Sequence, residues 1–311
     1  TYEECLIESI KCHHNNITNY FLNNYIANND KSYIHYIIKS YNFIALAEML
    51  NNESFDLYDW TFINNIAQLK GFLIYYDFYK MNHNIADFLI TNTNIAFVNI
   101  KVEGIIKNAL NVAVENNDIK LVQSLISNPK IDVNTLFIDY KMKDTVLTYA
   151  LKCKYFEIAK LLIQNSKIDV NFKAIKCYNE ETALTISIRN NYDEITELLL
   201  MMSNIDVNTQ AIHYNSIESP LIIAVKNANI KIIKLLLQKP DINVNAISKI
   251  DSNNEAALSL AIKNKNIEII KILLAHPSIN PIVFNMDESG DDSLIYLIRY
   301  NHSKILKLLL N

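Results

Sequence analysis

Short apolar runs with helical spacing alternate with polar breaks along most of the chain. Residues 182–208 show one unit of this pattern, in which a polar break at 190–192 separates two runs. The first run holds Ala183, Leu184, Ile186 and Ile188, and the second holds Ile195, Leu198, Leu199 and Met202. Three- and four-residue spacing places such positions on one helix face. The pattern predicts two amphipathic helices joined by a tight turn, with Thr182 capping the first.

The unit recurs at an interval of 37 residues. One anchor is the tetrapeptide Ile131-Asp132-Val133-Asn134, which returns at 168–171 and 205–208, changes to Ile-Asn-Val-Asn at 242–245 and degenerates at 279–282. The second anchor is a leucine, found at Leu110, Leu147, Leu184, Leu221, Leu258 and, one residue early, Leu294. Two independent anchors with one period indicate a repeat. The predicted units are 108–144, 145–181, 182–218, 219–255, 256–291 and a partial unit at 292–311.

A unit of this size cannot bury its apolar face alone, so neighbouring units must stack. The sequence therefore predicts an all-α fold, an α-solenoid over residues 108–311. These units resemble ankyrin repeats: the family's Thr-Pro-Leu-His-x-Ala signature is similar to 182–187, 219–224 and 256–261, and its second helix to 232–237 and 269–274. The resemblance implies helix-turn-helix-loop units that bind a protein through the inter-repeat loops and the concave face of the first helices.

The units depart from the family pattern in three ways. The family's inter-helix glycine is absent, and Asn117, Asn191 and Asn229 lie in that turn, where asparagine tolerates a left-handed backbone. The signature histidine is also missing, which we expect to remove a side-chain hydrogen bond. The period exceeds the family's usual length of about 33 residues, and we place most of the excess in the loop after the tetrapeptide.

Residues 1–107 do not keep the 37-residue interval and hold 19 of the 31 aromatic residues. Weaker echoes of the unit at 5–22, 37–43 and 79–90 predict a divergent helical N-terminal cap of degenerate ankyrin-like units, since terminal repeats are atypical. The region resembles the N-terminal parts of large, divergent ankyrin proteins of AT-rich protist genomes. The alternative is a separate domain with a small-molecule pocket, lined by Tyr75, Tyr76, Phe78 and Tyr79.

Composition argues against several classes of function. The 29 basic and 33 acidic residues leave a net charge of -4, which offers no basic field to nucleic acid. Three scattered glycines cannot form a glycine-rich nucleotide loop, and no apolar stretch predicts a membrane span. Four dispersed cysteines and the absence of a signal peptide favour a reduced, cytoplasmic protein.

Candidate chemistry is sparse. Cys5, Cys12, His13 and His14 are potential zinc ligands, but their spacing matches no closed zinc site. No pattern of catalytic residues is present either. We therefore expect no enzyme, no cofactor and no metal.

Charged residues flank the predicted first helices. Basic residues at their ends are Lys152, Arg189, Lys226, Lys263 and Arg299, and acidic residues before their starts are Asp144, Glu181, Glu218, Glu255 and Asp291. The basic row is either a positive strip that binds an acidic partner or a complement to the helix dipole, which favours cations at C-termini and anions at N-termini. The opposite signs at opposite ends favour the dipole. Lys152, Arg189, Lys226 and Lys263 remain candidates for partner binding.

The inter-repeat loops carry large side chains: Phe137, Tyr140, Tyr178, His213, Tyr214 and Phe284. Aromatic residues supply much of the energy of protein interfaces, so these residues are candidate partner contacts. The alternative is that some of them fold back and stabilise the loops.

The sequence therefore predicts a non-catalytic protein–protein interaction module or scaffold. The chain lacks an initiator methionine and stops inside an apolar run at 308–310, so we expect a fragment. A first alternative is accordingly a targeting or regulatory segment of a larger enzyme or channel. A second is a small-molecule site in residues 1–107.

Overall fold

A computed structural model of the chain describes residues 1–24, 36, 40, 100–102, 105–107, 109–129, 131–139, 142–250, 253–282 and 292–310. The chain forms two compact units, Thr1–Phe137 and Ile138–Asn311. The predictions for Tyr140, Phe284 and Asp291, and for a pocket at 75–79, lie outside the described residues.

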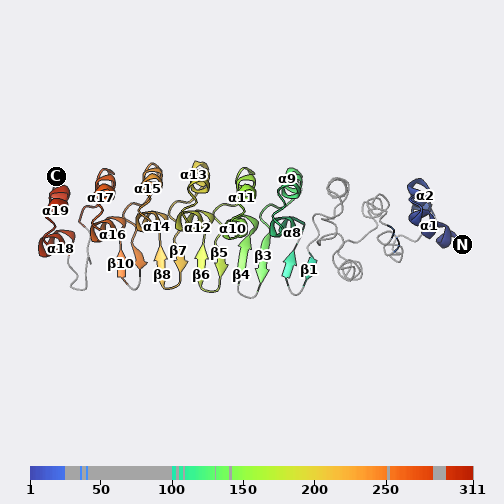
Figure 1. Cartoon of the computed structure of the whole chain (residues 1–311), viewed down its shortest axis with the longest axis horizontal. Helices are drawn as coiled ribbons and strands as arrows, with labels where there is room; N and C mark the ends of the chain where they lie inside the picture. The colour runs from blue at the N-terminus through green and yellow to red at the C-terminus, as the bar shows by residue number, and fades with distance from the viewer. Residues whose placement is uncertain are drawn as a thin grey trace. The chain divides into compact units, whose positions relative to one another are not determined.

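Helical hairpins run through the second unit. Its first helices are α10 (Val146–Lys152), α12 (Ala183–Arg189), α14 (Pro220–Lys226), α16 (Ala257–Lys263) and α18 (Ser293–Arg299). Its second helices are α11 (Phe156–Ile163), α13 (Asp193–Met201), α15 (Ile230–Leu237), α17 (Ile267–Leu274) and α19 (Ser303–Leu310). Helices α10, α12, α14 and α16 contact one another in order, as do α11, α13 and α15, and Figure 1 shows the two rows. The predicted helix-turn-helix units are confirmed.

The recurring leucines form the core of these repeats, and hydroxyl side chains cap their first helices. Leu147, Leu184 and Leu258 are fully buried. Thr182 Oγ1 accepts a hydrogen bond from the N–H of Thr185, as predicted for a helix cap, and Ser219 Oγ accepts one from the N–H of Ile222 in the same way.

Hydroxyl groups replace the missing histidine of the family signature. Thr148, Thr185 and Ser259 accept hydrogen bonds at 2.8–2.9 Å from the N–H of the residue three positions earlier, which is the cap position. Ile222 has no hydroxyl, and there Ser248 from the neighbouring strand accepts from the Ser219 N–H at 3.0 Å. The side-chain hydrogen bond that we expected to be lost is therefore supplied by other groups.

The turn between the two helices of each unit passes through a left-handed residue. These residues are Asn117, Lys154, Asn191, Ala228, Lys265 and Asn301, with φ between 51° and 62°. The prediction is confirmed for Asn117 and Asn191 and is wrong for Asn229. Asn229 is instead the cap of α15, and its side chain accepts from the N–H of Ile232 at 3.2 Å.

We expect Ala228→Gly to raise the free energy of unfolding by about 1 kcal/mol. At φ 51° the Ala228 Cβ crowds the backbone, a strain worth about 1–2 kcal/mol that glycine avoids at some cost in chain entropy. Urea denaturation followed by circular dichroism measures the change. The control is Ala275→Gly, because Ala275 is exposed at φ -72° and should gain nothing. Equal effects of the two changes would contradict the prediction.

The all-α prediction must be corrected, because strands connect the helical hairpins. The strands are β3 (Leu136–Asp139), β4 (Met142–Thr145), β5 (Ala174–Lys176), β6 (Asn179–Glu181), β7 (Ala211–His213), β8 (Ser216–Glu218), β9 (Ser248–Ile250) and β10 (Asn253–Glu255). They form one antiparallel sheet in the order β10-β9-β8-β7-β6-β5-β4-β3, drawn below the first helices in Figure 1.

These hairpins lie in the loops where we placed the additional residues of each unit. Their strands are only three or four residues long, and their tips at 177–178 and 214–215 lack glycine. Cys177 and Tyr214 nevertheless adopt φ of 56° and 54°. The usual sequence signal of a tight hairpin, an Asn-Gly or Asp-Gly pair, is therefore missing at these tips.

The described parts of the first unit are two helical hairpins and one β-hairpin. They comprise α1 (Tyr2–Lys11), α2 (Asn15–Asn24), β1 (Ile100–Val102), β2 (Ile105–Lys107), α8 (Ala109–Glu115) and α9 (Ile119–Ser127). Helices α1 and α2 confirm the helix-turn-helix predicted at 5–22. The cap predicted for 1–107 as a whole stays a prediction. No helix within the described ranges is long and apolar enough to cross a membrane.

Candidate functional site

The tetrapeptide links each repeat to the next. In its second copy, Ile168 and Val170 are buried, and Asp169 Oδ1 accepts a hydrogen bond from the Asn171 N–H at 3.0 Å. The Asn171 amide then bonds forward: Nδ2 donates to the Asn204 carbonyl at 2.7 Å, and Oδ1 accepts from the Asp206 N–H at 2.9 Å. One side chain thus joins two repeats with two hydrogen bonds.

The next two repeat junctions show the same arrangement. Asn208 bonds to the carbonyl of Asp241 and the N–H of Asn243, and Asn245 bonds to the carbonyl of Ser278 and the N–H of Asn280. We call Asn171, Asn208 and Asn245 the asparagine ladder. An amide carries both a donor and an acceptor, and this explains why the last tetrapeptide position is asparagine. The ladder fixes the spacing of the segments that lead into the hairpins.

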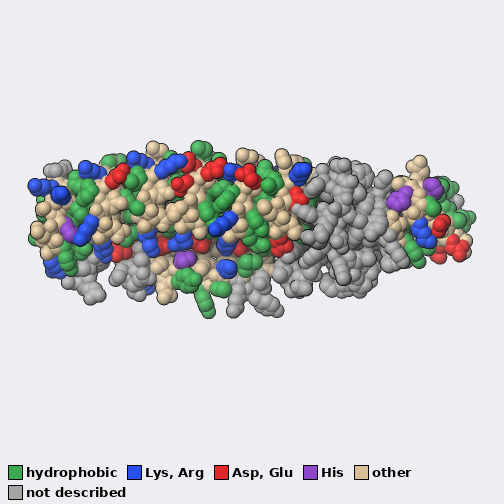
Figure 2. All heavy atoms as spheres, viewed as in Figure 1, with side chains coloured by type: hydrophobic (Ala, Val, Ile, Leu, Met, Phe, Trp, Pro, Cys, Tyr) green, Lys and Arg blue, Asp and Glu red, His purple; other side chains and the backbone are tan. Residues whose placement is uncertain are grey.

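Carboxylates on the helix-facing side of the hairpins bind the cations at the ends of the first helices. The pairs are Asp144–Lys152 at 2.6 Å, Glu181–Arg189 at 2.7 Å, Glu218–Lys226 at 2.5 Å and Glu255–Lys263 at 2.5 Å. We call these eight residues the charge belt. Figure 2 shows basic and acidic side chains alternating along it.

Small residues make room for the carboxylates. The strand register sets Ala174 opposite Glu181, Ala211 opposite Glu218 and Ser248 opposite Glu255. Residues opposite each other in antiparallel strands point to the same face. Ala174, Ala211 and Ser248 are each 1% exposed, so this face of the sheet is buried.

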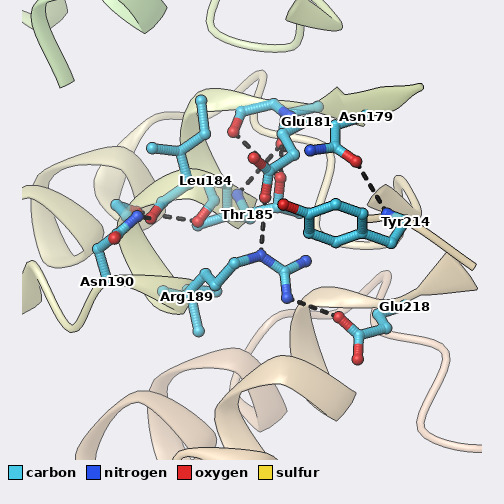
Figure 3. A network of polar contacts seen from close by, with 12 residues as sticks. Asn179, Glu181, Leu184, Thr185, Arg189, Asn190, Tyr214 and Glu218 are labelled. Carbon is cyan, nitrogen blue, oxygen red and sulfur yellow. Dashed lines mark hydrogen bonds and ion pairs between the residues drawn. The ribbon is translucent and has the colours of Figure 1, made fainter. Parts of the chain in front are cut away.

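Arg189 is the one cation of the charge belt observed to bind two of its carboxylates. Its Nε binds Glu181 in β6, just before α12, and its Nη1 binds Glu218 in β8, just before α14, at 2.7 Å, as Figure 3 shows. Burial alone would raise the pKa of the Glu218 carboxyl, but hydrogen bonds from Lys226 and Arg189 outweigh it and lower that pKa. Burial would likewise lower the pKa of Arg189, and hydrogen bonds to Glu181 and Glu218 raise it.

The four candidate cations therefore sit in ion pairs rather than on an open strip. Their side chains are 20–40% exposed. The signs at the two helix ends agree with the dipole interpretation, but that interpretation missed the direct contact. Each seven-residue first helix rises about 10 Å, and the long side chain of the lysine or arginine at its end reaches back to the carboxylate before its start.

The aromatic candidates separate into buried and exposed groups. Phe137 is 1% exposed, so the partner-contact prediction must be corrected for it: the side chain folds into the core, which was the alternative. Tyr178 and Tyr214 are 87% and 75% exposed at neighbouring hairpin tips. His213 is partly buried and packs edge-on against Tyr214 at 4.7 Å. The Tyr214 N–H donates to Asn179 Oδ1 at 2.8 Å, which holds the two hairpins together (Figure 3).

Sequence reasoning missed the outer face of the sheet. Lys143, Ile175, Glu180, Ile212, Ile217 and Lys249 stand opposite one another in successive strands. The alternation of Ala174, Ile175 and Lys176 was a signal for this face, but three residues are too few to distinguish a strand from a loop. Among the described residues, no group of three or more His, Cys, Asp or Glu side chains is placed to hold a metal ion.

Comparison with known proteins decides the family. A family model described as "Ankyrin repeats (3 copies)" matches residues 76–174, 110–211, 173–248 and 221–311, about three quarters of the chain. The chain belongs to the ankyrin-repeat family. Ankyrin repeats are generally protein–protein interaction modules. The search of curated proteins finds no match.

Solved ankyrin structures resemble this ankyrin repeat protein at low identity. The ankyrin repeat protein EF0377 is 23% identical over 65% of this chain and 96% of its own, with a TM-score of 0.50. An ankyrin repeat domain (ABAYE2397) from Acinetobacter baumannii AYE is 24% identical over 65% and 95%, also at 0.50. The ankyrin repeat domain of Bcl-3 is 20% identical over 68% and 88%, at 0.49. The first two likenesses show the shared fold.

Proposed function

We propose that this ankyrin repeat chain is a non-catalytic module that binds a protein partner through its hairpin tips and the adjoining concave face of the first helices. The observation that carries the proposal is the exposure of Tyr178 and Tyr214 on neighbouring tips. Exposed aromatic side chains on a fixed backbone contribute binding energy to an interface, and they lose little conformational entropy on binding. The Asn179–Tyr214 hydrogen bond supports the proposal, because it holds the two tips in one arrangement.

The cations of the charge belt hold the hairpins in place instead of forming the open binding strip considered from the sequence. Lys152, Arg189, Lys226 and Lys263 each hold a hairpin carboxylate against a first helix. We therefore assign them to positioning the hairpins and assign partner contact to the tips. The cytoplasmic location and the domain boundary at 107/108 stay predictions.

We expect the double change Tyr178→Ala and Tyr214→Ala to reduce partner capture at least about tenfold while leaving the melting transition unchanged. Exposed aromatic anchors commonly carry about 1–2 kcal/mol each at an interface, and 1.4 kcal/mol is tenfold in affinity. The measurement is quantitative mass spectrometry of proteins retained from a lysate of the source cell.

The matched control is Met201→Ala, which removes a side chain 77% exposed on the second helix α13. A partner must be retained by the parent and the Met201 variant and lost with the tyrosine pair. If the retained proteins are the same for all three, the partner surface does not include the hairpin tips.

A further inference from the structure

The outer face of the hairpin sheet carries one continuous row of side chains. The register places Lys143 opposite Ile175, Glu180 opposite Ile212, and Ile217 opposite Lys249, and the intervening pairs within hairpins complete the row. We call these six residues the outer row. All six point to one face, opposite to the buried face of the charge belt. Ile175, Ile212 and Ile217 are partly exposed at its centre, and Lys143 and Lys249 are exposed at its ends.

The two faces of the sheet divide the charges of the hairpins. The carboxylates of Asp144, Glu218 and Glu255 are buried against the first helices. On the strands whose side chains are described, every exposed charged residue is a lysine: Lys143, Lys176 and Lys249. These three acids are thus neutralised inside, whereas Glu180 lies in the outer row. Of the lysines, Lys143 and Lys249 lie in the outer row, and Lys176 lies near a hairpin tip on the same face as Ala174. The outer row therefore holds two lysines and one glutamate, a net positive charge, although the whole chain carries a net charge of -4.

We infer that the outer row binds an extended peptide segment of a partner protein, with acidic residues near both ends and an apolar middle. This inference rests on the proposed function and adds the class of partner. Five strand separations of about 4.8 Å set Lys143 about 24 Å from Lys249, which an extended segment of about seven residues spans. Its carboxylates meet the two lysines, and its apolar side chains cover the isoleucines.

The row fits such a segment better than a continuous polyanion. Glu180 lies in the middle of the row, opposite Ile212, and its carboxylate would repel a phosphate backbone crossing there. The three isoleucines offer apolar contact, which a phosphate backbone does not use. A basic residue inside the bound segment would pair with Glu180. Opposite charges at matched positions give such a surface its selectivity.

The test uses a phage library of random seven-residue peptides, panned against the full chain. A variant with Lys143→Glu and Lys249→Glu serves for counter-selection, and Lys234→Glu with Lys271→Glu is the control with an equal charge change on exposed second-helix lysines. We expect the selected peptides to be acidic at both ends and apolar between. A synthetic selected peptide, measured by fluorescence anisotropy, should bind the outer-row variant about tenfold more weakly and the control unchanged. A peptide with lysines at its ends should regain binding to the outer-row variant.

Three results would overturn the inference. One is that no peptide depends on the two lysines, and another is that selected peptides lack acidic ends. The third is that a ten-nucleotide oligouridylate, or vesicles containing phosphatidylserine, bind through Lys143 and Lys249 more tightly than any peptide. If the tyrosine variants still lose the partner in these cases, the inference fails and the proposed function stands. If they do not, the proposed function fails as well.

Discussion

Replacing Asn171 and Asn208 together by alanine will lower the free energy of unfolding by about 2–4 kcal/mol. Each amide donates to one backbone carbonyl and accepts from one backbone N–H of the following repeat, so the double change removes four hydrogen bonds. A typical hydrogen bond contributes about 0.5–1.5 kcal/mol net. All four hydrogen bonds lie at exposed positions, so water satisfies the freed backbone groups, and we expect a loss in the lower part of the summed range.

Urea denaturation of the parent and the variants measures this loss. The control is Asn215→Ala at an exposed hairpin tip, which should change stability by less than about 0.5 kcal/mol. Asn208→Asp is informative because the carboxylate can still accept from Asn243, yet it repels the Asp241 carbonyl. We expect it to be at least as harmful as Asn208→Ala. A double variant as stable as the Asn215 variant would mean that the ladder contributes nothing to the stacking.

Changing Arg189 to alanine will lower the free energy of unfolding by about 2–4 kcal/mol. The guanidinium binds Glu181 and Glu218, and the Glu218 side chain is 1% exposed. Removing one partner of a buried ion pair leaves the remaining charge buried without a partner. In fully buried pairs this lowers the free energy of unfolding by about 3–5 kcal/mol. We expect somewhat less here, because Lys226 still binds Glu218 and Arg189 is 20% exposed. Arg189→Lys can keep one of the two contacts and should lose about half as much.

The pH dependence shows whether the loss is electrostatic. The pKa of Glu218 is lowered in the folded chain by hydrogen bonds from Lys226 and Arg189, which outweigh burial. A lowered carboxyl pKa stabilises the fold above the ordinary value of about 4.3, and this stability is lost as the pH falls through the folded pKa. The difference in unfolding free energy between the parent and the Arg189→Ala variant should therefore shrink below about pH 4. Glu218→Gln should show a weaker acid dependence than the parent. A difference that stays constant from pH 7 to pH 3 would assign the loss to packing.

The helical part of the fold could be predicted from the sequence because its signals span many residues. The leucines and the tetrapeptide recur often enough to reveal the units, and Thr182 and Ser219 have the cap chemistry of a helix start. The left-handed turn was predicted correctly at Asn191 but not at Ala228, because alanine gives no hint of a positive φ. Asn229 was misassigned because a cap and a left-handed turn favour the same residue type.

The surface was harder to predict because each feature depends on a partner distant in the sequence. The sequence shows 43 asparagines, but it does not show that Asn171 reaches Asn204 and Asp206. Phe137 and Tyr178 both lie between helices, but Phe137 is buried within strand β3 and Tyr178 is exposed at the tip between β5 and β6, a difference that the residue types do not reveal. The charged rows were read as two ends of a helix dipole because their mutual contact spans eight residues.

The asparagine ladder makes every junction that it joins chemically alike. The amides of Asn171, Asn208 and Asn245 bond only to backbone groups of the next repeat. These hydrogen bonds therefore do not depend on which side chains the next repeat carries. If one whole repeat were duplicated or deleted in the gene, the same hydrogen bonds would form at the new junction without any further substitution. Nearest-neighbour stacking has the same property. Lineages can thus change the length of such an array in single steps, while the residues exposed on its rim diverge independently.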